Sequence, residues 1–170
     1  MKTLYVLRHA KSSWDHPGTS DFDRPLNKRG LKAAPDMGSV LAQFPVPPEL
    51  ILTSSALRAR ETSQRVQEAL GSVPLQDNPD LYLAPASELI VQLQKTPETL
   101  NALLLVGHNP GLEQLVEVLC FGQSFGALPL RTAGLVHLEL TVERWKNLGP
   151  GQACLNALIP ARLIDRLLHS

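Results

Sequence analysis

The sequence predicts an α/β fold in which a mostly parallel sheet lies between two layers of helices. Strand-like and helix-like segments alternate from one end of the 170-residue chain to the other, which is typical of such three-layer α/β/α folds. The apolar runs 3–7 and 103–106 have the composition of strands that are buried on both faces. A chain of this length forms one domain, 1–170, without room for a large cap.

The elements are predicted from the period of the apolar residues. Strands are expected over short apolar or alternating runs, namely 3–7, 49–53, 103–106, 134–142 and 154–159. Helices are expected at about 28–43, 56–70 and 88–93, and from 110 and 160 onward. The N-caps are expected to be short polar residues, namely Asn27, Ser54 or Ser55, Ser87 and Asn109. Residues 11–26 form a polar loop across the top of the sheet, and 75–83 an extended or irregular link.

Two histidines lie at the ends of predicted buried strands. His9 comes two residues after the run 3–7, and His108 comes two residues after the run 103–106. The handedness of parallel crossovers brings the ends of these strands, and of the strand 49–53, to one edge. Open α/β folds bind ligands at that edge, so the sequence places two imidazoles where a ligand is expected.

The bulk composition argues against several classes of partner and site. Sixteen basic and sixteen acidic residues leave no net charge, so neither a nucleic-acid nor a membrane surface is expected. Cys120 and Cys154 are too few for a metal cluster and are expected to be small buried residues. Because the N-terminus begins as a strand and lacks the pattern of a signal peptide, we expect a cytoplasmic location.

Two arginines lie where a phosphate would bind. Arg8 precedes His9, and Arg58 falls in the first turn of a predicted helix. The planar guanidinium donates two parallel hydrogen bonds to phosphate, and a helix N-terminus near Ser54 and Ser55 offers free N–H groups. The alternative for Arg58 is a structural ion pair with Asp23 or Glu61.

Several segments, in order, carry a family resemblance, namely Leu7-Arg8-His9, Asp23-Arg24-Pro25-Leu26 with Arg29-Gly30, 53–59 with Thr62, and Val106-Gly107-His108-Asn109-Pro110. In these motifs the chain resembles the histidine phosphatase superfamily, which includes the phosphoglycerate mutases. Its short length, the extension Lys11-Ser12-Ser13-Trp14 and the stretch 128–135 are most similar to the SixA-type phosphohistidine phosphatases. One departure is Ala10, where the superfamily has glycine.

The resemblance implies a phosphoglycerate mutase-like fold and a role for each matching residue. His9 would be the nucleophile that forms a phosphohistidine, and His108 would donate a hydrogen bond to the phosphoryl oxygens. A lone histidine is more often structural, but this one is flanked by arginine and ends a buried strand. The catalytic set is therefore His9, Arg8, Arg58 and His108. The expected substrate-binding residues are Lys11, Ser12, Arg24, Ser54 and Ser55.

No segment clearly matches the acid that protonates the leaving group in many members of the superfamily. Glu88 and Asp21 are the two candidates, and Glu88 is otherwise a first-turn residue stabilised by the helix dipole. A missing acid fits a substrate whose leaving group is already good, such as the imidazole of phosphohistidine. No metal or other cofactor is expected, because the arginines supply positive charge and the histidines and cysteines lack ligand spacing.

These observations predict a metal-independent phosphatase that works through a phosphohistidine intermediate and acts on phosphohistidine in a partner protein, in signal transduction. A broad phosphomonoesterase acting on small phosphorylated molecules is the alternative within enzymes. A phosphate-binding module without turnover is the alternative from another class.

Overall fold

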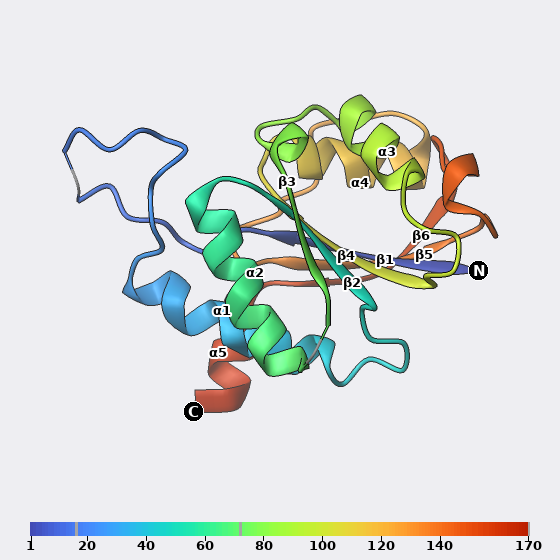
Figure 1. Cartoon of the computed structure of the whole chain (residues 1–170). Coiled ribbons are helices and arrows are strands. Elements are labelled where there is room, and N and C mark those ends of the chain that lie inside the picture. Colours follow the sequence, from blue (N-terminus) through green and yellow to red (C-terminus); the bar gives the residue numbers. More distant parts are fainter. Residues whose placement is uncertain (16, 72, 170) are drawn as a thin grey trace.

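The computed structural model describes residues 1–15, 17–71 and 73–169 (Figure 1). Within these residues, six strands form one sheet in the order β3-β2-β4-β1-β5-β6. The strands are β1 (Lys2–Arg8), β2 (Leu50–Ser54), β3 (Leu75–Asn78), β4 (Ala102–Gly107), β5 (Leu135–Leu140) and β6 (Ala153–Ile159). The first four in this order are parallel, while β5 and β6 pair antiparallel at one side. The expectation of a mostly parallel sheet is confirmed.

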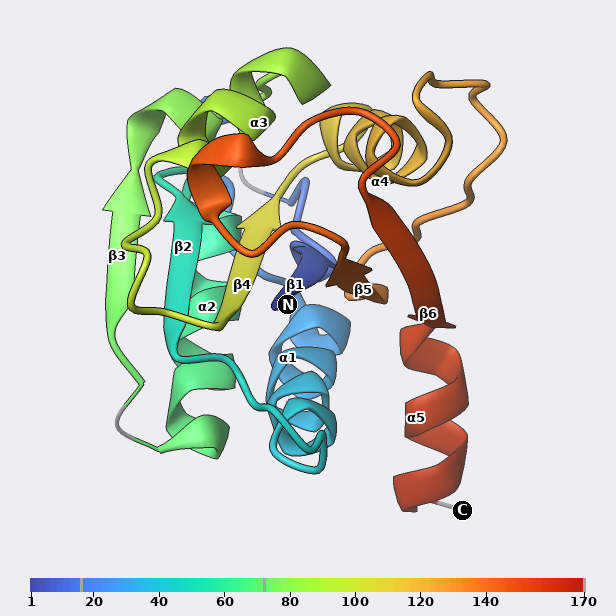
Figure 2. The ribbon, with the colours of Figure 1, turned by 90° about the vertical axis from the view of Figure 1, so that its right-hand side faces the viewer.

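In the described part of the chain, five α-helices cover the two faces of the sheet, so that the fold has three layers. They are α1 (Lys28–Leu41), α2 (Leu57–Leu70), α3 (Ala86–Gln94), α4 (Gly111–Phe121) and α5 (Ala161–His169). Figure 2 shows α3 and α4 on one face and α1, α2 and α5 on the other. Short 3-10 turns occupy Pro79–Leu81 and Trp145–Asn147.

The central strands are buried on both faces, as their apolar runs predict. In β1, Leu4 and Val6 join the core beneath α3 and α4, whereas Tyr5 and Leu7 join the core beneath the other three helices. The same alternation holds in β4. Because side chains of a strand point alternately to opposite faces, one apolar run supplies both cores.

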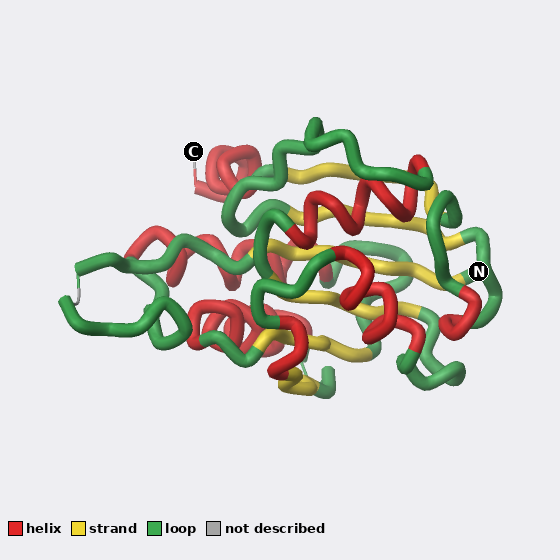
Figure 3. The backbone as a smooth tube through the Cα atoms, turned by 90° about the horizontal axis from the view of Figure 1, so that it is seen from above, coloured by secondary structure: helices red, strands yellow, loops and turns green. Residues whose placement is uncertain are grey.

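The register places three strand ends side by side. Arg8 of β1 pairs with Gly107 of β4, and Thr53 of β2 pairs with Val106 of β4. His9, Ser54 and His108 therefore emerge at the same edge, as the crossover rule predicts. The long connection between β1 and α1 extends beyond this edge (Figure 3); His16, in this connection, lies outside the described residues.

Some predicted helix boundaries are confirmed and others are wrong. Asn27 caps α1, with its side chain accepting from the Gly30 N–H, and Gly71 ends α2. The α1 helix stops at Leu41, two residues before the predicted end. The link 75–83 contains an extended part, β3, followed by a 3-10 turn.

The three other predicted N-caps are wrong. The residues before α2, α3 and α4 are Ala56, Pro85 and Pro110, and none of them caps through a side chain. Ser87 lies inside α3. The other polar side chains have different partners: the Ser54 hydroxyl contacts His108, Ser55 donates to Asp77, and Asn109 donates to the Leu130 carbonyl.

Two further findings concern the composition. Cys154 is exposed and Cys120 is half-buried, and both are free, so the expectation that they are buried is wrong for Cys154. Among the described residues, none of the helices has the length and apolar character needed to cross a membrane.

Candidate active site

His9 lies buried at the end of β1 with one ring nitrogen free to act as a base or nucleophile. Its Nδ1 is 2.8 Å from the carbonyl oxygen of Ala10, so this nitrogen carries the proton and donates. The other nitrogen, Nε2, keeps its lone pair and accepts from Arg58 Nε at 3.3 Å. Burial, and then the charges of Arg58 and Arg8, lower the pKa of His9 to about 4. The imidazole is therefore neutral at pH 7.

The backbone after His9 is held by two contacts. The N–H of Ala10 donates to the Thr62 hydroxyl at 3.0 Å, and that hydroxyl donates to the carbonyl of Arg58. Ala10 is fully buried and lies outside the positive-φ region, so alanine takes the place of glycine without strain. A Cβ at Gly30 would overlap the carbonyl oxygen of Lys11, so glycine there lets α1 approach this segment.

His108 lies beside His9 on the neighbouring strand end. The centres of the two rings are 5.1 Å apart, and His108 Nε2 lies 2.7 Å from the hydroxyl of Ser54. Burial, followed by the nearby His9 and Arg58, lowers the pKa of His108 to about 3. Its Nδ1 is buried without a hydrogen-bond partner. A neutral ring with a free nitrogen of this kind is able to donate to an oxyanion once Nδ1 carries the proton.

Asp21 connects the long loop to the arginines. Arg58 donates to the Asp21 carboxylate at 3.0 Å and to its carbonyl at 2.5 Å, and Arg24 and Tyr82 donate to the same carboxylate at 3.1 and 2.6 Å. The Tyr82 hydroxyl first, and the charges of Arg58 and Arg24 next, hold the pKa of Asp21 below its ordinary value. The carboxylate partner of Arg58 is thus Asp21, and neither Asp23 nor Glu61.

Arg8 leaves β1 on a different side from His9. Its Nη1 donates to the Leu130 carbonyl at 3.0 Å, and Asn109 donates to the same oxygen at 2.7 Å. Glu113 of α4 in turn accepts from the Leu130 N–H. The segment around Leu130 therefore connects Arg8, the last residue of β1, with Asn109, which follows β4.

The buried polar atoms without a partner are concentrated here. Five such side-chain atoms occur in the described part of the chain, and three of them are donors near the two histidines: Arg8 Nε, Arg24 Nη1 and His108 Nδ1. A buried donor without an acceptor costs stability, so native proteins rarely keep several together without a functional reason. The arrangement fits an oxyanion ligand. We call His9, Arg24, Arg58 and His108 the histidine pocket.

The structure brings some predicted residues to this pocket and leaves others aside. Ser54 contacts His108 directly. Ser55 instead donates to Asp77 of β3 at 2.6 Å, and Ser12 is buried in a backbone bridge to Leu26. Lys11 is exposed and lines a separate groove together with Arg8. Glu88 is exposed in the first turn of α3, and its carboxylate forms no hydrogen bond with another described residue.

Tyr82 is the residue of this site that sequence reasoning missed. Its ring lies edge-on to His108 with centres 5.5 Å apart, and its hydroxyl holds Asp21. It follows the 3-10 turn after β3, in the segment that the sequence describes only as an irregular link. No motif marks it.

The geometry is that of an α/β protein in which two buried histidines and two arginines lie together at the carboxyl edge of the sheet, an arrangement suited to an oxyanion. The family model for the histidine phosphatase superfamily (branch 1) matches residues 4–82. The SixA protein of Agrobacterium tumefaciens is 30% identical, and its solved structure superposes with a TM-score of 0.78 over 94% of this chain and 97% of that one. The chain belongs to the histidine phosphatase superfamily and is of the SixA type.

Two other solved structures share the fold. A protein histidine phosphatase SixA complexed with tungstate is 24% identical, with a TM-score of 0.79 over 95% of this chain and 99% of that one. A mycobacterial glucosyl-3-phosphoglycerate phosphatase complexed with VO3 is 16% identical, with a TM-score of 0.67 over 92% and 98% of the two chains. The fold alone therefore accommodates different phosphatases.

Proposed function

We propose that this histidine phosphatase transfers a phosphoryl group from phosphohistidine of a partner protein to His9, and then to water. The observation that carries the proposal is the state of His9. It is buried, neutral and held through Nδ1, with the Nε2 lone pair directed at the guanidinium of Arg58. A neutral imidazole held in this way is a competent nucleophile.

The reaction has two steps at this nitrogen. His9 Nε2 attacks phosphorus, the P–N bond of the substrate breaks, and the substrate imidazole leaves with the electron pair and takes a proton from water. A water molecule then attacks the phosphoryl group on His9 and the P–N bond breaks, so that inorganic phosphate leaves and the His9 ring regains its lone pair. The proton that the attacking water releases neutralises the hydroxide left by the first step. Splitting one displacement into two lowers the barrier of each.

The arginines and His108 stabilise the transferred group. Arg58 lies within hydrogen-bonding distance of the attacking nitrogen, and Arg24 and His108 each keep a buried donor without a partner. Donors placed in advance around developing charge are the largest single source of catalysis in many enzymes. Since the two arginines supply the positive charge and His9 supplies the nucleophile, the proposed steps need no metal ion.

The leaving group supports phosphohistidine as the substrate. An acid that protonates an alkoxide needs a raised pKa, whereas the hydrogen bond from Tyr82 and the charges of Arg58 and Arg24 keep the pKa of Asp21 low. We assign Asp21 to positioning Arg58 and Arg24. Glu88 is left without a role. An imidazole leaving group takes its proton from solvent and needs neither carboxyl group.

The mouth of the site favours a protein as the substrate. Trp14 is 74% exposed and stacks on the guanidinium of Arg24, whose carbon lies 3.5 Å from the ring centre. An exposed aromatic ring fixed beside a binding pocket is a suitable contact for a partner protein. Such a partner would place the enzyme in cytoplasmic signal transduction.

The test compares leaving groups. We expect rapid release of phosphate from a histidine-phosphorylated phosphotransfer protein and from activated aryl phosphates, slow release from alkyl phosphates, and a steep dependence of kcat/KM on leaving-group pKa. Glu88→Gln and Asp21→Asn should leave that slope unchanged. A flat dependence that either variant makes steep would establish an acid and a small-molecule phosphomonoesterase. Binding of phosphate without turnover of any substrate would establish a binding module.

A further inference from the structure

A second group of cations lies beside the histidine pocket, in a groove of about 620 Å³. The groove is lined by residues of α1, by the start of α5 and by residues 131–133, which precede β5. The cations that line it are Arg8, Lys11, Arg29, Lys32, Arg131 and Arg162. Two carboxylates, Asp36 and Asp165, are the acidic members. We call this the cationic groove.

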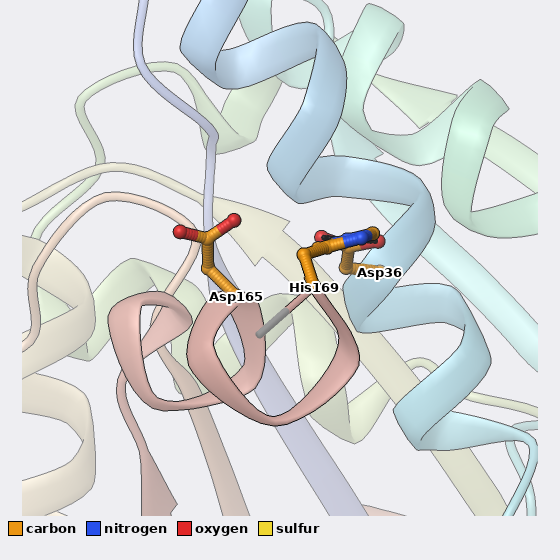
Figure 4. Close-up of side chains that lie close together, drawn as sticks. All are labelled: Asp36, Asp165 and His169. Carbon is orange, nitrogen blue, oxygen red and sulfur yellow. Dashed lines mark hydrogen bonds and ion pairs between the residues drawn. The ribbon is translucent and has the colours of Figure 1, made fainter.

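Both carboxylates already have partners. Lys32 Nζ lies 2.5 Å from Asp165, and His169 Nε2 lies 3.1 Å from Asp36. Figure 4 shows Asp165 and His169 on α5, with Asp36 on the facing helix α1. A metal ion at these three residues would have to compete with the Lys32 ammonium, so the cluster joins the two helices and carries no separate site.

Most of the cations, by contrast, have no carboxylate partner. Among the described residues, no carboxylate oxygen lies within 4.0 Å of the charged nitrogens of Arg8, Lys11, Arg29, Arg131 or Arg162. The protein as a whole has no net charge, so this local surplus is not a consequence of composition. A groove lined by charges of one sign focuses the potential and attracts counter-ions.

The start of α5 adds to the same field. Pro160, Ala161 and Arg162 line the groove, and the nine-residue helix begins at Ala161. The first N–H groups of a helix have no acceptor within the helix and carry the positive end of its dipole. Arg8, whose buried Nε without a partner is one of the donors described above near the two histidines, also lines the groove. The groove therefore offers both charge and directed donors.

We propose that the cationic groove binds a small ligand that carries two or more linked phosphates, at a site distinct from the histidine pocket. Neither His9, His108 nor Arg58 lines the groove. A volume of about 620 Å³ lies in the range of small-molecule sites, and several cations around a compact volume require a ligand with several charges. Guanidinium groups bind phosphate oxygens in pairs. The proposal does not depend on turnover at His9.

The test is titration calorimetry with inorganic tripolyphosphate, on the wild type and on matched variants. Arg29→Ala with Arg162→Ala should weaken binding at least tenfold, which is about 1.4 kcal/mol. Arg65→Ala with Arg144→Ala removes the same charge outside the groove and should leave the affinity unchanged. Arg58→Ala and His9→Ala should also bind normally, which separates this site from the proposed active site.

Three results would overturn the proposal. The first is equal affinity in the Arg29/Arg162 variant and the wild type. The second is loss of binding in Arg58→Ala or His9→Ala, which would place tripolyphosphate in the histidine pocket. The third is an acidic peptide such as oligoglutamate that binds the groove more tightly than tripolyphosphate, which would make the groove a docking site for protein.

Discussion

The histidine pocket and the surroundings of Glu117 both bury charge, but they differ in how completely that charge is satisfied. Glu117 of α4 is 2% exposed and accepts from the Ser124 hydroxyl and from the four N–H groups of residues 125–128. Arg24 and His108 keep donors without partners. A buried charge whose hydrogen bonds are all made holds a loop in place, whereas one with spare donors is ready for a ligand.

The difference also appears in the pKa values. The Ser124 hydroxyl first, and the backbone N–H groups of the loop next, lower the pKa of Glu117 to about 2, which favours the charged form. Burial lowers the pKa of both pocket histidines and favours their neutral form. Mutations should therefore affect stability at Glu117 and activity at the pocket.

The largest expected effect is that of His9→Ala on turnover. Removal of the proposed nucleophile should reduce kcat by at least about 10⁴-fold, while the free energy of unfolding changes by about 1 kcal/mol or less. Rapid quenching of the wild type should show acid-labile, base-stable phosphate on His9. The exposed His169→Ala is the control and should stay active. A fully active His9→Ala enzyme would contradict the mechanism.

Arg58→Ala should have the next largest effect on activity. Loss of this donor should lower kcat/KM by at least about 10²-fold and weaken vanadate binding. Stability should change little, because Asp21, the carboxylate left behind, is 44% exposed and is hydrated once Arg58 is removed. The control is Arg65→Ala on the same helix. Unchanged kinetics with a large fall in Tm would instead make Arg58 structural.

Glu117→Gln should reverse this pattern. The amide NH₂ replaces one acceptor and faces backbone N–H groups, so the protein should lose about 2–3 kcal/mol of unfolding free energy, with kcat nearly unchanged. Urea denaturation and the phosphatase assay measure the two effects. Glu68→Gln, on the exposed side of α2, is the matched control. If Glu117→Gln lost activity and kept its stability, the contrast between the two regions would fail.

Local sequence patterns predicted the elements that are held by burial. The apolar runs of β1 and β4 specify buried parallel strands, and the register then brings His9 and His108 together. The cap at Asn27 is also a local property, since its side chain bonds the Gly30 N–H three residues away. For these residues, a short run of sequence is enough to define the strand or the cap, and the general rules of parallel sheets then place the strand ends side by side.

The failures concern side chains whose partners are distant in sequence. Ser54 and Asn109 have the residue type of an N-cap, but His108 and the Leu130 carbonyl compete for them. Tyr82 reaches Asp21, which is 61 residues away. The cationic groove combines residues from both ends of the chain, so a net charge of zero concealed it. Contacts of this kind have no local signal.

The smallest expected effect is a difference in acid sensitivity. His9 and His108 have folded-state pKa values of about 4 and 3, against about 6.5 for an unperturbed histidine. Between these values the unfolded state binds more protons, so stability is full above pH 6.5 and falls as the pH decreases toward 4. Glu117 also loses stability as the pH falls, but at lower pH. Its folded-state pKa is about 2, against an ordinary value of 4.5, so its contribution to stability decreases only below about pH 4.5.

The two windows make the regions separable in one titration of stability against pH. When the pH is lowered from 6.5 to 5.5, protonation of each pocket histidine in the unfolded state should reduce the free energy of unfolding by about 1 kcal/mol. The variant His9→Asn with His108→Asn should lose this slope, and Glu117→Gln should keep it. Burial also lowers the pKa of His137, which remains in all of these proteins, so only the difference between the curves is assigned to the pocket. Urea denaturation at pH 6.5 and 5.5 measures it, and an equal slope in the double variant would show that the pocket histidines are not held neutral by burial.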